Sequence, residues 1–466
     1  MPQAGKPKRI KTRIGIRNRN RNRVVILGLD GMPYRLIADL SRKGVMPNMA
    51  ELIAEGVFRE MASSIPEVSS VAWSSIITGK NPGEHGIFGF TDLMPGSYSV
   101  FFPNFSNLKA PPFWEREESG RSVIINVPST YPATARAMNG VLISGFVALE
   151  LEKACYPPSL APELERLDYR LDVDSEKAHK SMELFLKDLE RTLEARISAY
   201  RYFWEGEDWE TFMLVFTGTD RLAHFLWEAY EDKSHRYHEA FLEHLRRIDR
   251  VIGEITDRMK EDDILILLSD HGFERLEKEV YVNSILKGEG FLKLEPEGSG
   301  NLEDLAGKTR AFALDPGRIY LNSKGKYPRG SISPKDKEGV IAELIDLFEG
   351  LRLDGRRVVR RVCRKEEIYH GPFLDRAPDM VLLPERGFNF RGRVELDRDR
   401  SSESEEGLSR PRPQPRQPFT GKHAQEGAFL LVKGSAAQKA VPPRPKVSDV
   451  VGVIDRLVCA CHVNLR

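Results

Sequence analysis

The chain has 466 residues, of which 41% are hydrophobic and 30% are charged, and its formal net charge is +1. These proportions are typical of a soluble globular protein, and the balanced charge gives the whole molecule no preference for polyanions. Four cysteines in so long a chain exclude a disulfide scaffold. No apolar run approaches the roughly 20 residues that a membrane-spanning helix needs. We therefore expect a cytoplasmic protein with a large buried core.

The first 23 residues carry an uneven share of the charge. They contain nine Lys or Arg residues and no Asp or Glu, so the rest of the chain has a net charge of −8. We interpret residues 1–23 as a basic, disordered tail. The alternative is that this tail binds nucleic acid or anionic lipid. The apolar run VVILGL that follows is too short for the core of a signal peptide and is predicted to be a strand.

Short apolar runs rich in β-branched residues recur between helical patterns. In chain order they are 24–29, 122–127, 141–146, 212–217, 264–269, 318–322, 380–384 and 429–432. Continuous apolar runs are typical of strands that are buried on both faces of a mostly parallel sheet. Helical periodicity predicts amphipathic helices at about 178–205 and 234–260. The alternation predicts an α/β fold, a doubly wound and mostly parallel sheet sandwiched by helices.

Two segments rich in proline and acidic residues, 95–118 and 147–178, interrupt this alternation. We interpret residues 24–466 as a single domain in which the stretch 95–210 holds cap or insert segments. Residues 397–420 have low complexity and are predicted to form a mobile loop.

Carboxylate and imidazole side chains stand at the ends of several predicted strands. They are Asp30 after the first strand, Asp220 and His224 after 212–217, Asp270 and His271 after 264–269, and His423 ahead of the last strand. Each has an ordinary explanation when taken alone, such as a helix cap for Asp30. Ligands collect at the carboxyl ends of strands in open α/β sheets, so their coincidence predicts a metal site.

The residue types narrow the predicted cofactor. Mixed carboxylates and imidazoles favour Zn²⁺, with Mn²⁺ or Fe as alternatives, over Ca²⁺ or Mg²⁺. Six such side chains exceed what one tetrahedral ion needs, which predicts two divalent ions. Two ions about 4 Å apart can stabilise both oxygens of a phosphoryl displacement, and one of them can activate a serine hydroxyl. Such a pair of ions predicts a small phosphorylated substrate.

Five motifs occur in an order and with spacings that are shared with a known family. They are LGLDG, PEVSSVAWSSIITGKNPGEHGIFGF, TGTDRLAHFLW, LLSDHGF and GKHAQEGAF. Over most of residues 24–466 the chain resembles the alkaline phosphatase superfamily, and within it the type I phosphodiesterase/nucleotide pyrophosphatase family. The resemblance implies an alkaline-phosphatase-like fold with small cap insertions and a metal-dependent phosphodiesterase or pyrophosphatase activity, for which a nucleotide is one candidate substrate.

The resemblance also divides the strand-end residues into two sets of ligands. One metal would be held by Asp30, Asp270 and His271, and the other by Asp220, His224 and His423.

The serine-rich motif would supply the nucleophile. The family position corresponds to Ser69, whose oxygen would bridge the two metals, attack phosphorus and form a phospho-enzyme. Ser70 is a candidate for binding the phosphoryl oxygens through its backbone N–H, and His85 is interpreted as a structural histidine. The chain departs from the family at Phe90, where nucleotide pyrophosphatases carry an Asn that hydrogen-bonds the phosphoryl group. A phenyl ring cannot donate that bond, so the choice between monoester and diester stays open.

Three alternatives to a phosphodiesterase remain at this point. A cofactor-independent phosphoglycerate mutase-like phosphotransferase has a similar ligand set but needs a large inserted domain with arginines, which we do not find in the sequence. A phosphomonoesterase is the second alternative. The third is a non-catalytic binding or scaffold protein that retains the fold.

Overall fold

The computed structural model describes residues 22–116, 119–295, 302–393, 409–411 and 419–463. Almost all of the predicted basic tail and most of the predicted mobile loop 397–420 lie outside the described residues, so both stay predictions. Within the described part of the chain, no helix is both long and apolar enough to span a membrane.

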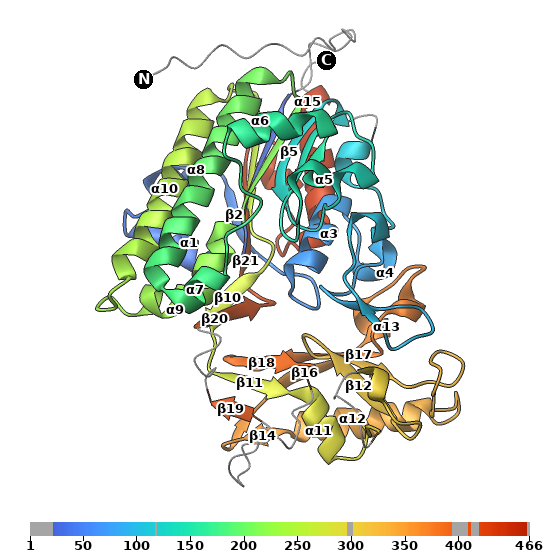
Figure 1. Cartoon of the computed structure of the whole chain (residues 1–466). Helices are drawn as coiled ribbons and strands as arrows, with labels where there is room; N and C mark the ends of the chain where they lie inside the picture. The colour runs from blue at the N-terminus through green and yellow to red at the C-terminus, as the bar shows by residue number, and fades with distance from the viewer. Residues whose placement is uncertain (1–21, 117–118, 296–301, 394–408, 412–418, 464–466) are drawn as a thin grey trace.

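A mixed eight-stranded sheet forms the centre of the upper body of the molecule (Figure 1). In spatial order its strands are β2 (Val57–Met61), β21 (Ala428–Lys433), β9 (Ile264–Leu268), β1 (Val24–Leu29), β8 (Thr211–Phe216), β5 (Ser122–Val127), β6 (Gly140–Ser144) and β7 (Cys155–Tyr156). The pairs from β9 to β6 are parallel, whereas β2, β21 and β7 are joined by antiparallel pairing. The α/β fold class predicted from the sequence is confirmed.

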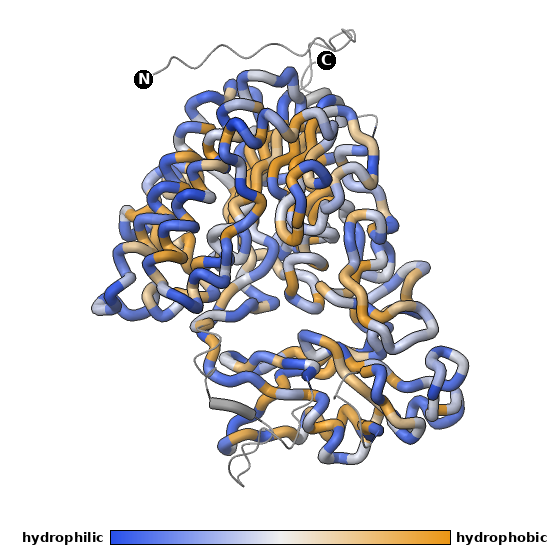
Figure 2. Tube along the Cα trace, in the orientation of Figure 1, coloured by the Kyte–Doolittle hydropathy of each residue, from blue (hydrophilic) through white to orange (hydrophobic). Residues whose placement is uncertain are grey.

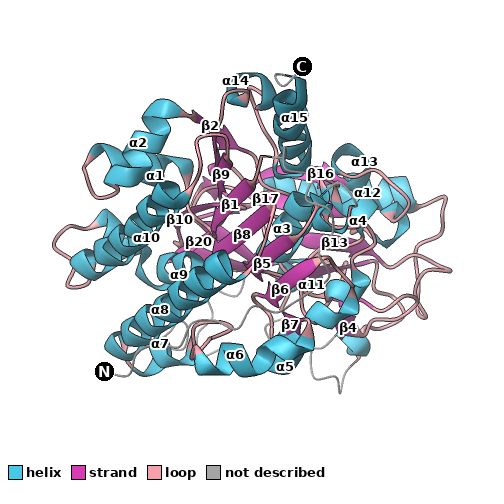
Figure 3. Cartoon of the chain, turned by 90° about the horizontal axis from the view of Figure 1, so that it is seen from above, coloured by secondary structure: helices cyan, strands magenta, loops and turns pink. Residues whose placement is uncertain are grey.

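The sheet is buried on both faces because helices cover each of them (Figure 3). One face carries α1 (Tyr34–Arg42), α2 (Pro47–Glu55), α8 (Met182–Gly206), α9 (Gly218–Glu231) and α10 (His238–Arg258), and the other carries α3 (Ser69–Thr78) and α15 (Val450–Val463). Alternate residues of β1 belong to different cores: Val25 and Leu27 pack into the first, and Val24 and Ile26 into the second. A strand with two apolar sides reads as one continuous apolar run.

A second body, drawn below the first in Figure 1, has its own sheets and its own hydrophobic cluster. One sheet has the order β12 (Ala311–Leu314), β13 (Arg318–Leu321), β17 (Met380–Pro384) and β16 (Val359–Arg364); the other has β18 (Phe388–Arg391), β11 (Lys278–Tyr281) and β19 (Ser409–Pro411). Helices α11 (Val282–Gly288) and α12 (Lys337–Gly350) pack beside them. Figure 2 shows hydrophobic segments inside both bodies.

The apolar runs 318–322 and 380–384 were expected in the main sheet, and this expectation is wrong. They form β13 and β17, which pair antiparallel with each other in the second body. Ile319 and Met380 are buried in the cluster of that body. An apolar run shows that a strand is buried, but it does not show which sheet buries it.

The two bodies are connected through a short antiparallel pair, β10 (Gly272–Arg275) and β20 (Gly421–Ala424). A hairpin of β3 (Asp92–Leu93) and β4 (Val100–Phe101) also reaches the second body, because Leu93 and Tyr98 pack into its cluster. The stretch 95–210 contributes β5, β6, β7 and α8 to the upper body. The predicted domain boundaries stay a prediction.

Candidate active site

The six predicted metal ligands meet at one edge of the central sheet. The strands β9, β1 and β8 are neighbours and parallel, so the residues that follow them emerge at the same edge. Their positions are Asp30 directly after β1, Asp220 and His224 in α9 after β8, Asp270 and His271 between β9 and β10, and His423 in β20. All six side chains are buried or nearly so.

The three histidines are oriented in the same way. Each Nδ1 lies within hydrogen-bond distance of a backbone carbonyl: His224 at 3.2 Å from Gly421, His271 at 3.0 Å from Gly272, and His423 at 2.9 Å from Glu67. A carbonyl oxygen only accepts, so Nδ1 carries a proton, and in the neutral ring Nε2 then keeps its lone pair. This is the tautomer that binds a metal through Nε2, with its ring held by the backbone.

The carboxylate of Asp220 lies beside the Nε2 atoms of two histidines. Its Oδ1 is 3.1 Å from Nε2 of His423 and 3.5 Å from Nε2 of His224, and these two nitrogens are 2.9 Å apart. Nitrogens that both carry lone pairs repel at that distance unless a proton or a cation stands between them. Ligand atoms of Asp220, His224 and His423 lie within 4.8 Å of one another. The same limit holds for a second group, the ligand atoms of Asp30, Asp220 and His271.

Two carboxylate oxygens of the six candidate ligands are buried without a hydrogen-bond partner among the described residues. They are Oδ1 of Asp30 and Oδ2 of Asp270. Burial, reinforced by the charges of Asp270 and Asp220, raises the pKa of Asp30 well above its ordinary value, and burial raises the pKa of Asp270 to about 7. Such carboxylates need a compensating positive charge. The donor set and its orphaned oxygens therefore fit divalent metal ions.

The structure brings Asp270 to the same centre, although it belongs to neither of the two groups. Its Oδ2 lies 3.4 Å from Nε2 of His271, while its Oδ1 accepts a hydrogen bond from the backbone of Gly31 at 3.1 Å. Asp220 belongs to both groups. How the six residues divide between two ions stays a prediction.

Ser69 stands beside the same atoms, as the first residue of α3. Its Oγ lies 3.2 Å from Nε2 of His271. Ser70 follows it, and its buried Oγ has no hydrogen-bond partner among the described residues. The other two serines of the motif have structural roles, since Ser74 and Ser75 donate to the backbone carbonyls of Ser70 and Val71. Ser69 is thus the serine of this helix that reaches the candidate metal ligands.

A tryptophan of the serine-rich motif also reaches the site. Nε1 of Trp73, four residues after Ser69, donates to Oδ2 of Asp30 at 3.2 Å. Residues i and i+4 share one face of a helix, so the spacing from Ser69 to Trp73 was a usable signal. Arg221 was also missed, although it follows Asp220 directly; its Nη1 lies 3.5 Å from Oδ2 of Asp220.

A protein-family model for type I phosphodiesterase/nucleotide pyrophosphatase matches residues 24–410, which include five of the six candidate ligands and Ser69. The chain belongs to this family. It is therefore a phosphoryl hydrolase of the phosphodiesterase/pyrophosphatase type, and the members of this family depend on metal ions. No curated protein sequence matches the chain.

The chain shares its fold with solved structures to which its sequence identity is low. Phosphonoacetate hydrolase from Sinorhizobium meliloti 1021 is similar in complexes with phosphonoformate (TM-score 0.60, 16% identity) and with phosphonoacetate (TM-score 0.62, 15% identity), and both cover 94% of this chain and 96% of that one. Murine ectonucleotide pyrophosphatase/phosphodiesterase 5 has a TM-score of 0.53 at 14% identity and covers 94% of this chain and 95% of that one.

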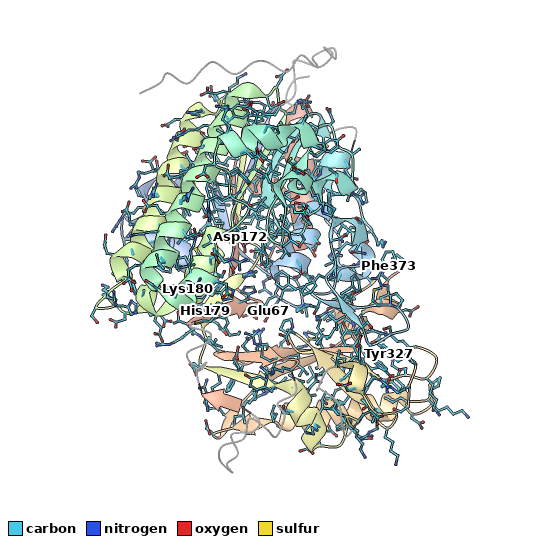
Figure 4. The ribbon with its side chains drawn as sticks, in the orientation of Figure 1. Glu67, Asp172, His179, Lys180, Tyr327 and Phe373 are labelled. Atoms are coloured by element: carbon cyan, nitrogen blue, oxygen red, sulfur yellow. The ribbon has the colours of Figure 1, made fainter. Side chains whose placement is uncertain are left out.

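A cleft of about 690 Å³ opens from the candidate site of this family member toward the second body. His224 and His423 line the cleft, and so does Phe90, which was expected from the sequence at the family's Asn position. Glu67, whose carbonyl holds His423, lines it too and is seen in Figure 4 where the two bodies face each other. The second body contributes Asp315, Pro316, Phe390 and Arg391, among others. The cleft therefore has room for a small molecule beside His224 and His423.

Proposed function

We propose that this chain hydrolyses phosphodiester or pyrophosphate bonds through a covalent phosphoserine at Ser69. Two divalent ions would be held by the carboxylate oxygens of Asp30, Asp220 and Asp270 and by Nε2 of His224, His271 and His423. Zn²⁺ is our first candidate, with Mn²⁺ or Fe as alternatives, because imidazole and carboxylate ligands occur together. The observation that carries the proposal is the 3.2 Å approach of the Ser69 Oγ to Nε2 of His271, inside this set of ligand atoms.

Bound metal ions would supply positive charge, which lowers the pKa of a nearby hydroxyl and stabilises negative charge on the phosphoryl oxygens. The chain contributes the nucleophile and its placement. Oγ of Ser69 loses its proton to solvent and attacks phosphorus, so that the Oγ–P bond forms while the bond from phosphorus to the leaving oxygen breaks. Water then forms a new O–P bond and gives up a proton to solvent, while the Oγ–P bond breaks and Oγ takes up a proton to regenerate the serine.

The start of α3 orients the substrate in this reaction. Ser69 and Ser70 are the first two residues of the helix, where backbone N–H groups have no partner within the helix. Such groups favour a phosphoryl anion, and the positive end of the helix dipole adds to the attraction. The leaving group would extend into the cleft, whose room suits a small phosphorylated molecule such as a nucleotide or, as in the phosphonoacetate hydrolase complexes, a phosphonate.

The decisive experiment compares Ser69→Ala with the wild-type protein loaded with Zn²⁺. Bis(4-nitrophenyl) phosphate, 4-nitrophenyl phosphate and 3-phosphoglycerate serve as substrates for the diesterase, the monoesterase and the mutase. We expect diester hydrolysis by the wild type and a loss of at least about 10³-fold in Ser69→Ala, with metal content retained. Phosphate trapped covalently on the wild-type peptide that contains Ser69, detected by mass spectrometry, provides an independent readout.

Ser74→Ala is the matched control. The Ser74 hydroxyl lies in the same helix and donates only to the carbonyl of Ser70, at 2.6 Å. It is a cleaner control than Ser75→Ala, because Ser75 also contacts Nε2 of His85 at 3.0 Å. A metal-free, inactive wild-type protein would favour the scaffold alternative, and conversion of 3-phosphoglycerate with an inert diester would favour the mutase.

A further inference from the structure

A carboxylate that lines the cleft has no partner among the described residues. Glu67 keeps only 6% of its surface exposed, and it belongs to the cleft lining. Its backbone carbonyl is taken by Nδ1 of His423 at 2.9 Å, but no hydrogen bond or ion pair of the described part of the chain reaches its carboxylate. A charge buried to this extent is costly unless it is paired. A ligand of the cleft can supply the missing partner.

Glu67 stands close to the reacting centre. It precedes the nucleophile candidate Ser69 by two residues, so their Cα atoms are at most about 7 Å apart. Its contact with His423 ties the same residue to a candidate metal ligand that also lines the cleft. Figure 4 shows Glu67 where the two bodies face each other. A substrate whose phosphorus is attacked by Ser69 therefore carries its organic groups past this carboxylate.

The cations of the cleft lining are already paired. Nε and Nη2 of Arg391 lie 2.8 and 2.6 Å from Oε1 of Glu279, and Nζ of Lys422 lies 2.9 Å from Oε1 of Glu274. Arg393 also has a partner. An anionic group that entered the cleft would have to compete with these carboxylates for the cations.

The other carboxylates of the lining differ from Glu67 in having hydrogen-bond donors. Glu303 accepts from Oγ of Ser99 at 2.7 Å, and Asp315 accepts from the backbone N–H of Gly392. The unpaired charge that the described lining offers to a ligand is therefore the negative charge of Glu67.

Aromatic rings supply a second feature of the cleft that suits a cation. Phe90, Tyr98, Phe390 and Phe419 all belong to the lining. The face of an aromatic ring attracts a positive charge, and an ammonium group also donates strong hydrogen bonds to a carboxylate. Aromatic walls and an unpaired carboxylate together are the surroundings that recognise a positively charged amine.

We propose that the cleft binds phosphodiesters whose organic group carries a positively charged amine, and that Glu67 is the ionic partner of this amine. This inference rests on the proposed function and names the substrate class of that site. The organic part of a pyrophosphate substrate that bears a further phosphate would be repelled by Glu67, so the inference selects the diester. The competing explanation is that the carboxylate supports metal binding, in which case its loss would lower the metal content and affect all substrates alike.

Two diesters of the same shape test the inference, 4-nitrophenyl 2-aminoethyl phosphate and 4-nitrophenyl propyl phosphate. They differ by one positive charge, and both release 4-nitrophenol. For the full chain loaded with Zn²⁺ we expect kcat/KM to be roughly tenfold or more higher for the aminoethyl ester, as for a hydrogen bond between charged groups. In Glu67→Gln, kcat/KM should fall about tenfold more for the aminoethyl ester than for the propyl ester. The variant keeps the backbone carbonyl that holds His423, so the difference reports on the carboxylate.

Two further variants accompany Glu67→Gln, with metal content measured on every sample. Glu67→Asp keeps the charge on a side chain that is one methylene shorter, and it should retain part of the preference for the amine. Glu289→Gln is the control, because it removes the same charge from an exposed residue of the second body that does not belong to the cleft lining. It should show the full preference. If Glu67→Gln does not fold, Glu67→Asp and the two esters with the wild type decide the question.

Equal kcat/KM for the two esters in the wild type, or a preference that survives in Glu67→Gln, would overturn the inference. So would a loss of metal in Glu67→Gln with an equal fall for both esters. A wild-type protein that cleaves neither ester would refute the proposed function. Calorimetry with 2-aminoethyl phosphate and propyl phosphate would then still decide the role of Glu67, since tighter binding of the amine that is lost in Glu67→Gln supports it and equal binding contradicts it.

Discussion

Trp73 holds Asp30 through a hydrogen bond of 3.2 Å from Nε1 to Oδ2. The indole is fully buried, and a Cβ added to Gly28 would lie only 2.5 Å from one of its ring carbons, so β1 leaves room for the ring by having a glycine there. The helix that begins with the nucleophile candidate Ser69 thus also orients the first candidate ligand. One short motif serves both purposes.

Replacing Trp73 with Phe should weaken metal binding about tenfold or more, because residues that orient metal ligands contribute that much to affinity. The measurement is a competition titration of Zn²⁺ against a chelator. Trp114→Phe is the control, because Trp114 is equally buried and has no hydrogen bond to a candidate ligand among the described residues. Equal Zn²⁺ affinity in wild type and Trp73→Phe would show that the hydrogen bond does not support the site.

Asp270→Asn should have opposite effects on the metal-free and metal-loaded protein. Burial raises the pKa of Asp270 to about 7, so between pH 3.8 and about 7 the metal-free native state holds a proton that the unfolded chain releases. Metal-free wild type therefore loses stability as the pH rises through that window. The amide of Asp270→Asn does not ionise, so this loss of stability with rising pH disappears. Its oxygen can still accept the hydrogen bond from the backbone N–H of Gly31.

We expect metal-free Asp270→Asn at pH 7.5 to be more stable than wild type by about 1 kcal/mol or more. Its gain in stability on adding Zn²⁺ should be much smaller, because a ligand stabilises only as far as it binds the native state. Thermal unfolding with EDTA and with Zn²⁺ measures both effects. A variant that is less stable without metal and gains as much from Zn²⁺ would contradict the assignment of Asp270.

His423→Ala should reduce the bound metal from two ions to one, because it removes an imidazole that lies within 3.1 Å of both His224 and Asp220. Metal content is measured by mass spectrometry after dialysis against a metal-free buffer. His370→Ala is the control, since its side chain is 78% exposed. Two tightly bound ions in His423→Ala would rule out its role as a ligand.

His85 should make the protein less stable at acidic pH. Burial lowers the pKa of this imidazole from 6.5 to about 3, so between these values the unfolded chain binds a proton that the native state does not. Stability contributed by His85 is fully present above pH 6.5 and decreases as the pH falls, by about 1.4 kcal/mol per pH unit at most. Urea unfolding between pH 7 and 4 measures the slope.

His85→Gln provides the comparison for that slope. The variant should show a shallower decrease in stability with falling pH, because other buried groups titrate equally in both proteins. The structural interpretation of His85 agrees with its contacts, since Nδ1 accepts from the backbone of Ile87 and Nε2 meets Ser75. Parallel slopes would mean that His85 keeps an ordinary pKa in the native protein.

Local sequence was sufficient to predict the central strands and the residues at their ends. β1, β8 and β9 are buried on both sides, so each is a continuous apolar run that is easy to recognise. The first polar residues after such runs must lie at the edge of a parallel sheet, where Asp30, Asp220 and Asp270 are found. The family resemblance then distinguished Ser69 from three neighbouring serines, which composition alone could not do.

Contacts between segments that are far apart in the sequence could not be predicted without the tertiary structure. β13 and β17 look like strands of the main sheet in sequence, but hydrophobic burial has no direction, and their partners are other strands of the second body. The pairing of Arg221 with Asp172 and the carbonyl of Glu67 behind His423 join residues 49 and 356 positions apart. Residue type and local spacing therefore determined which side chains could bind metal, and the family resemblance selected the serine. Only the folded chain decided which side chains hold those groups in place, because such contacts follow from packing and leave no periodic signal in the sequence.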